Sequence, residues 1–157
     1  MIETIRRRLR ETTVGEIDRT VTEWMARLGV PVLRVALSVV FIWFGALKIV
    51  GISPASQLVA ATVYVLESSV FVPILGVWEV LIGLCLLYRP LVRVGIALLF
   101  LQIPGTFLPI ILLPRVVFDP IPYGLTVEGQ YIIKNLVIIG AALVVGGAVR
   151  SDQRDDM

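Results

Sequence analysis

Long apolar runs, separated by short segments rich in Arg, Pro and Gly, make up most of this chain. A helix needs roughly 20 mostly apolar residues to cross the hydrocarbon core of a bilayer, which is about 30 Å thick. Runs of about this length predict four membrane spans, at residues 31–51, 72–88, 91–113 and 131–149. The turn Arg89-Pro90 between the second and third runs is so short that it predicts a helical hairpin.

The segments outside the spans predict three regions. In residues 1–29, apolar positions such as Ile17, Val21, Trp24 and Leu28 recur at roughly helical spacing, with Arg residues between them. A basic amphipathic helix of this kind is typical of a membrane surface with anionic lipids, and docking to a partner is the alternative. We predict an Arg-rich helix on the cytoplasmic face (1–29), a four-span domain (30–150) and a short charged cytoplasmic tail (151–157).

The segment 51–71 is less apolar than the predicted spans and divides into one apolar and one mixed face. This division favours an amphipathic helix lying in the membrane interface, although a fifth span is the alternative. The fold class predicted from the whole pattern is all-α. It is a membrane-spanning antiparallel four-helix bundle, with an N-terminal amphipathic helix and an interfacial helix between spans 1 and 2.

Composition and charge support a membrane location. The 157 residues are 57% hydrophobic, and the mean hydropathy of +0.92 is too high for an ordinary soluble domain. Basic residues gather in the N-terminal segment, around Arg89–Arg93 and at the C-terminal end, whereas segments 51–71 and 114–129 hold only Arg115. The positive-inside rule therefore predicts a multi-pass protein of the inner cell membrane with both termini in the cytoplasm. We expect no nucleic-acid partner.

The residue types that are missing limit the chemistry. The chain has no His and a single Cys, Cys85. This composition argues against a His-ligated haem, the usual zinc sites and an intrachain disulfide. We therefore expect no metal site and no intrinsic cofactor, and any redox role would need a bound organic molecule such as a quinone, or a partner subunit. Whether the chain is an enzyme stays open, because the sequence contains no visible catalytic centre.

In each predicted span we single out one charged or amide residue at its middle or in its outer half, at depths counted from the flanking arginines at about 1.5 Å per residue. These residues are Lys48, Glu79, Gln102 and Lys134. A charge at the centre of a span costs about 2.5–3.5 kcal/mol on insertion scales, so such residues are expected to face inward and pair. We predict an ion pair between Lys48 and Glu79.

Lys134 has three acidic candidates, since it could share Glu79 or reach Glu128 or Glu67. Around Glu79, Gly76 and Gly83 lie on the same helical face, which predicts that a neighbouring backbone approaches closely there. Further residues are peripheral candidates for the same site: Trp43, Glu67, Thr106, Glu128 and Asn135.

Three roles are open for this polar cluster. It could fix the rotation of the helices within the bundle, as some buried polar groups do. It could also line a pocket that opens toward the outer face and binds a quinone head group or a small anion. A partner interface is a third reading. The titratable groups do not form a continuous series across the membrane, so a proton path has little support.

Several stretches resemble the DoxX-like family of small four-span membrane proteins. They are FIWFGALK at 41–48, VWEVLIGLCLL at 77–87, LQIPGTFLPIILLP at 101–114 and YGLTVEGQYIIKNLVIIGAAL at 123–143. The resemblance covers roughly residues 30–150. It implies a membrane component in redox or oxidative-stress physiology, since the family includes proteins linked to thiosulfate or quinone oxidoreduction.

The leading hypothesis is therefore a DoxX-like accessory protein with a polar pocket that binds a quinone or a small anion. The first alternative is a structural subunit of a larger membrane complex, or a homo-oligomer, that packs through its N-terminal helix and its small-residue helix faces. The second alternative is a small solute transporter.

Overall fold

The computed structural model describes the backbone of residues 2–62 and 67–155, and the side chains of residues 15–62 and 67–149. Apart from one isolated β-bridge, the secondary structure of these residues is helical. The elements in chain order are α1 (Ile2–Val50), α2 (Ser56–Thr62), α3 (Ser68–Leu87), the 3₁₀ turn η1 (Arg89–Leu91), α4 (Val92–Leu112), α5 (Pro114–Val117), α6 (Val127–Ile133) and α7 (Asn135–Asp155).

Among the described residues, four stretches of helix are long and apolar enough to cross a membrane, and each overlaps one of the four runs predicted from the sequence. Their bounds are Gly15–Val50, Ser68–Leu87, Arg89–Leu112 and Val127–Val149. Helical structure is expected here, because a helix satisfies its own backbone hydrogen bonds where water is absent. The predicted hairpin is also present, since η1 connects α3 directly to α4 and the two helices contact each other.

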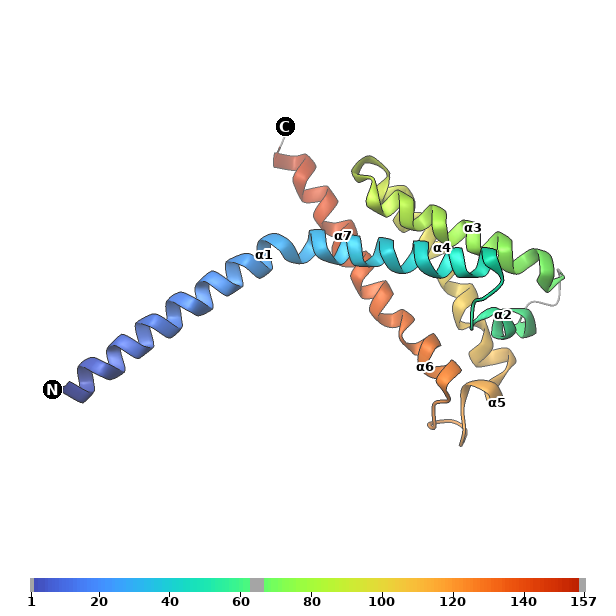
Figure 1. Cartoon of the computed structure of the whole chain (residues 1–157), viewed down its shortest axis with the longest axis horizontal. Coiled ribbons are helices and arrows are strands. Elements are labelled where there is room, and N and C mark those ends of the chain that lie inside the picture. The colour runs from blue at the N-terminus through green and yellow to red at the C-terminus, as the bar shows by residue number, and fades with distance from the viewer. Residues whose placement is uncertain (1, 63–66, 156–157) are drawn as a thin grey trace.

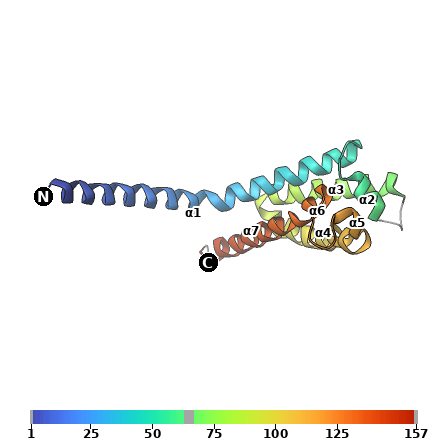
Figure 2. The ribbon, with the colours of Figure 1, turned by 90° about the horizontal axis from the view of Figure 1, so that it is seen from below.

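The first helix is longer than predicted. We expected a separate surface helix at 1–29, but α1 continues without interruption from Ile2 to Val50 and contains Pro31. A proline removes one backbone hydrogen bond, a loss that a long helix can tolerate with a local bend. The N-terminal half of α1 extends away from the other helices (Figures 1 and 2). Every residue from Gly15 to Gly29 is exposed, and the side chains of residues 1–14 lie outside the described residues.

The described part of the connection between the first two long helices contains one helix, α2. Gly51 ends α1 with φ +81°, a left-handed conformation that glycine adopts without a steric penalty. The amide of Ile52 donates to the carbonyl of Leu47 (3.0 Å), as in the usual glycine cap. Among the described residues of the predicted helical segment 51–71, Ser56–Thr62 form α2 and α3 begins at Ser68, while residues 63–66 lie outside the described residues.

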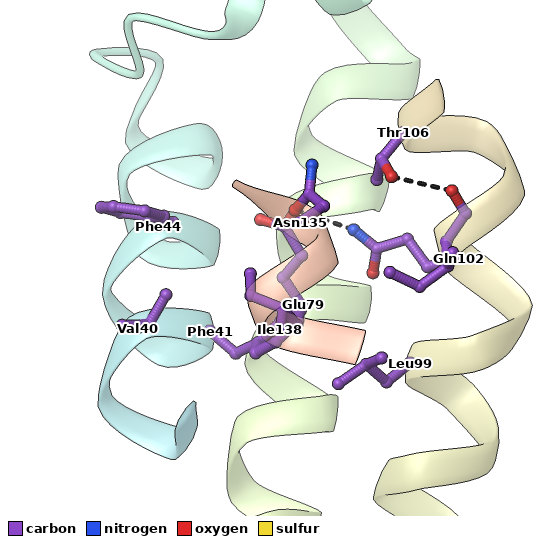
Figure 3. Close-up of a pocket in the computed structure, with 10 residues that line it drawn as sticks. Val40, Phe41, Phe44, Glu79, Leu99, Gln102, Thr106, Asn135 and Ile138 are labelled. Carbon is purple, nitrogen blue, oxygen red and sulfur yellow. Dashed lines mark hydrogen bonds between the residues drawn. The ribbon is translucent and has the colours of Figure 1, made fainter. Parts of the chain in front are cut away.

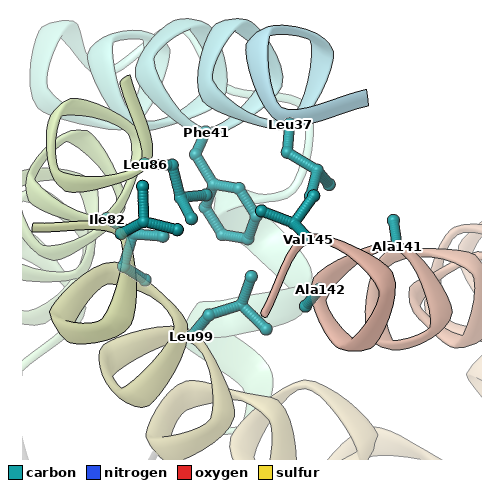
Figure 4. Close-up of a cluster of buried hydrophobic side chains, with 9 residues drawn as sticks. Leu37, Phe41, Ile82, Leu86, Leu99, Ala141, Ala142 and Val145 are labelled. Atoms are coloured by element: carbon teal, nitrogen blue, oxygen red, sulfur yellow. The ribbon is translucent and has the colours of Figure 1, made fainter. Parts of the chain in front are cut away.

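Side chains from α1, α3, α4 and α7 form a common apolar core (Figure 4). Among the larger ones, Ile82, Leu86, Leu99 and Val145 are at most 1% exposed. Ala142 on α7 is fully buried, so this helix can come close to its neighbours. The remaining members of the cluster are Leu37, Phe41, Val92 and Ala141. This core holds the four helices around the polar residues described below.

The connection before the last helices is compactly folded. Phe118 pairs with Leu125 in an isolated antiparallel bridge, and the amide of Asp119 donates to the carbonyl of Gly124 (2.6 Å). A Cβ atom added to Gly124 would collide with the carbonyl of Asp119, so the tightness of this turn requires glycine. The peptide bonds before Pro120 and Pro122 are cis.

The fourth predicted span differs from the structure in its start and its continuity. The helix begins at Val127 rather than Tyr131, because the Thr126 hydroxyl caps it by accepting a hydrogen bond from the amide of Gly129 (3.0 Å). The helix is then interrupted at Lys134, between α6 and α7. The backbone of the tail is helical as far as Asp155, but the side chains of the predicted charged tail, 151–157, lie outside the described residues.

Candidate functional site: a polar cavity between the four long helices

The helices α1 and α3, which carry the two charged residues of the site, approach each other unusually closely. A Cβ atom added to Gly45 would lie 2.5 Å from the carbonyl oxygen of Gly76, and one added to Gly76 would lie 2.6 Å from the carbonyl oxygen of Gly45. One added to Gly83 would lie 2.7 Å from the carbonyl oxygen of Ser38. The two backbones therefore touch over two turns. The close approach predicted around Gly76 and Gly83 is confirmed.

This contact brings together the two charges predicted to pair. Lys48 Nζ lies 2.6 Å from Glu79 Oε2, and the two residues are only 6% and 7% exposed. Each residue follows a contact glycine by three positions, Gly45 on α1 and Gly76 on α3, so the helical repeat places both side chains beside the contact. Lys48 and Glu79 neutralise each other in an apolar environment where either charge alone would be costly.

The second carboxylate oxygen is bound from α4. Gln102 Nε2 donates a hydrogen bond to Glu79 Oε1 (2.9 Å), so Glu79 accepts from two helices at once. Figure 3 shows Gln102 reaching from α4 toward Glu79. Gln102 Oε1 is buried and has no hydrogen-bond partner among the described residues. Nearby, the indole of Trp78 donates to the carbonyl of Leu98 (3.3 Å) and adds a second polar link between α3 and α4.

A partly open cavity of about 80 Å³ lies beside this cluster. Its walls come from all four long helices (Figure 3). The polar lining residues are Glu79, Gln102, Thr106 and Asn135, and the apolar ones are Val40, Phe41, Phe44, Leu99, Ile103 and Ile138. A small number of convergent polar groups on an apolar wall is the usual make-up of a small-molecule site.

Of the peripheral candidates, two line this cavity. The Thr106 hydroxyl donates to the carbonyl of Ile103 on its own helix (2.7 Å), which leaves its oxygen available as an acceptor. Asn135 Nδ2 donates a long bond of 3.4 Å to the carbonyl of Tyr131. The other three candidates are exposed and do not line the cavity: Trp43, Glu67 and Glu128.

Lys134 does not join the cluster. Its side chain is exposed, and its ammonium nitrogen lies 5.0 Å from the centre of the Tyr131 ring. The residue falls in the turn between α6 and α7. A lysine near the end of a span can extend its charged group to the interface while its methylene chain covers apolar surface, so no buried carboxylate is needed.

Sequence reasoning missed the apolar walls of the cavity. Leu99 and Ile138 look like any other residues in an apolar run, so the sequence does not distinguish these two wall positions from lipid-facing ones. The sequence does hold a signal for the wall formed by α1. Phe44 and Phe41 precede Lys48 by one and two helical turns, so they lie near the helix face that carries Lys48. In the part of the chain that the structure describes, no cluster of His, Cys, Asp and Glu could hold a metal ion.

Comparison with known proteins adds no relative. No family model matches the chain, and no curated protein or solved structure matches it. The chemistry of the site must therefore be argued from its own residues.

Proposed function

We propose that the cavity binds the head group of a small, membrane-soluble ligand of the quinone/quinol class. The observation that carries this proposal is Gln102 Oε1, a buried acceptor without a partner among the described residues, in a side chain that lines the cavity. An unsatisfied buried polar group costs about 1–3 kcal/mol, and the quinol form, whose hydroxyl can donate a hydrogen bond to this oxygen, recovers much of this cost. The mixed lining suits a molecule with a polar oxygen on an apolar ring.

The wider role we propose is that of a DoxX-like accessory component in redox or oxidative-stress physiology. The four stretches that resemble this family include Lys48, Glu79, Gln102 and Asn135, all of which lie at or beside the cavity. The chain has no His and one Cys, so a bound quinone or a partner would have to carry the electrons. The chain itself would supply the binding site.

We also propose how the protein lies in its membrane. The four long helices would form an antiparallel bundle across the inner cell membrane, with both termini in the cytoplasm. Support comes from the basic residues around α1 and η1 and from the nearly uncharged connection at α2. In this orientation α2 would lie in the outer interface, and the Arg-rich start of α1 would lie near anionic lipids.

Ligand-dependent stabilisation tests the proposed site. The purified protein in detergent would be unfolded thermally with and without decylbenzoquinone or its quinol. Binding of either form should raise the midpoint, since a ligand at about 100 times its Kd stabilises by about 2.7 kcal/mol. Gln102→Leu should abolish the shift with the quinol, whose hydroxyl can donate to Gln102 Oε1, whereas the exposed control Gln130→Leu should keep it. A quinol shift that is absent from wild type, or unchanged in Gln102→Leu, would rule out this site.

A second candidate is a structural subunit of a larger membrane complex, or a homo-oligomer. It is favoured by the N-terminal half of α1, where Ile17, Val21, Trp24 and Leu28 are between 46% and 63% exposed. Their spacing puts them on one stripe of the helix, as expected for a helix that packs against another surface. Mild detergent extraction followed by size measurement is the test, and a free monomer before any harsher treatment would contradict it.

A further inference from the structure

We propose that the cavity selects a neutral hydroxyl group, as in a phenol or a quinol, over an oxygen that can only accept hydrogen bonds, as in a quinone or an ether. This inference rests on the proposed ligand site and specifies its chemistry. Four features of the cavity support it: the orientation of the Gln102 amide, the character of the other polar groups, the balance of charge and the volume.

The orientation of the Gln102 amide is fixed by its partner. Nε2 faces Glu79 Oε1 at 2.9 Å, and the opposite oxygen of Glu79 is bound by Lys48. If the amide were turned over, its oxygen would face a carboxylate oxygen, and two acceptors would meet with no proton between them. The group left over is therefore the carbonyl oxygen, Oε1, which needs a donor from the ligand.

The remaining polar groups at the cavity are mostly acceptors as well. The single hydroxyl proton of Thr106 is used by the carbonyl of Ile103, so only its lone pairs are left for a ligand. The Glu79 carboxylate has no proton to offer while it is paired with Lys48. Asn135 has one amide proton in addition to the one directed at Tyr131. A hydroxyl fits this set, because it can donate to Gln102 and accept from Asn135.

The charges disfavour an ionic ligand. Glu79 lines the cavity while Lys48 does not, so an anion would meet the carboxylate first. A cation would gain little attraction, because the Lys48 ammonium already neutralises Glu79 at 2.6 Å. This reduced attraction would have to offset the cost of removing the ion from water. The small anion expected from the sequence is therefore disfavoured, and a neutral ligand remains.

The volume limits how much of the ligand is enclosed. About 80 Å³ is roughly half of the 150 Å³ that encloses a benzene molecule in an engineered cavity. The cavity can therefore take a hydroxyl and the adjoining edge of a ring, with the rest of the molecule extending outward. Phe44, which lines the cavity and is 51% exposed, marks a side on which this extension would meet an aromatic surface.

A matched pair of probes tests the preference. 4-Ethylphenol and 4-ethylanisole share a ring and a chain, but only the phenol can donate a hydrogen bond from its oxygen. Dissociation constants for the full chain in detergent should be at least about tenfold lower for the phenol, because the ether leaves Gln102 Oε1 unsatisfied. Gln102→Leu should remove the preference, and the exposed control Gln130→Leu should retain it. 1-Hexanol as a third probe distinguishes an aliphatic from an aromatic hydroxyl source.

The outcomes separate the two proposals. Tighter binding of the phenol, lost in Gln102→Leu, supports the hydroxyl preference. Equal binding of phenol and anisole to wild type overturns the preference but leaves the ligand site intact. Binding of neither probe, together with no response to decylbenzoquinone or its quinol, overturns both. The wild-type comparison needs no variant, and if Gln102→Leu does not fold, Thr106→Val removes a second acceptor and should reduce the preference without eliminating it.

Discussion

A Cβ atom added to Gly45 would lie 2.5 Å from the carbonyl oxygen of Gly76, so at this level the backbones of α1 and α3 are in direct contact. Three residues further along each helix, Lys48 and Glu79 form the buried ion pair. Small residues let helices approach closely in a membrane, where dispersion contacts and polar interactions replace the hydrophobic effect as the driving force. The glycine contact and the ion pair are thus two parts of one interface.

Gly76→Ala should destabilise the protein by about 1–3 kcal/mol, because the added methyl group would force apart two backbones that cannot relax separately. Gly140→Ala is the matched control, since a Cβ atom there meets nothing within 4 Å and alanine favours a helix. Unfolding in detergent measures both. Equal stability of the two variants would show that the contact is not as tight as the structure has it.

Removing one partner of the ion pair should cost far more than removing both. We expect Lys48→Met and Glu79→Leu each to lower the free energy of unfolding by about 3–5 kcal/mol, because each leaves an uncompensated buried charge. The double variant should recover most of that loss, since an apolar pair of similar volume is often neutral or stabilising. A double-mutant cycle measures the coupling, and additive losses would refute the pairing.

The Thr126 hydroxyl should matter for the start of α6. Besides capping Gly129, it donates to the carbonyl of Val116 (2.6 Å) and so connects the helix to α5. Thr126→Val should cost about 1 kcal/mol, the usual loss for an N-cap residue. Thr22→Val at an exposed position of α1 is the control and should change stability little. Thermal unfolding of both variants measures the two stabilities, and equal midpoints would contradict the role of the Thr126 cap.

The proposed orientation can be tested by labelling. In a Cys85→Ser background, a cysteine at the exposed position Glu128 should react with a membrane-impermeant maleimide in intact cells. A cysteine at exposed Glu16 should react only after the cells are permeabilised. The reverse pattern would place the termini outside, contrary to the distribution of arginines.

The sequence was sufficient for the parts of this structure that follow from the energetics of the membrane. Apolar length predicted four helices that could span, and the cost of burying Lys48 and Glu79 predicted their pairing. The glycine spacing around Glu79 predicted the close approach. In each case placing the residue elsewhere in the membrane would carry a large energetic cost, so the sequence pattern is compatible with few other structures.

Other features depend on contacts that no local pattern encodes. The sequence could not show that α1 continues through Pro31, because the loss of one hydrogen bond is small beside the many that a long helix retains. Depth along the span predicts that Lys134 belongs to the cluster, but the rotation of the helix about its axis decides which way a side chain faces, and this one is exposed. Leu99 became a cavity wall only through the packing of four helices.

The continuity of α1 has a mechanical consequence. Its 49 residues form one helix, which at about 1.5 Å per residue corresponds to roughly 74 Å of length. Residues 15–29 are exposed at one end, and Lys48 is buried near the other. Because one helix joins the two ends, a surface that holds the exposed end would restrict the tilts open to the segment that carries Lys48, apart from the bend that Pro31 allows between them.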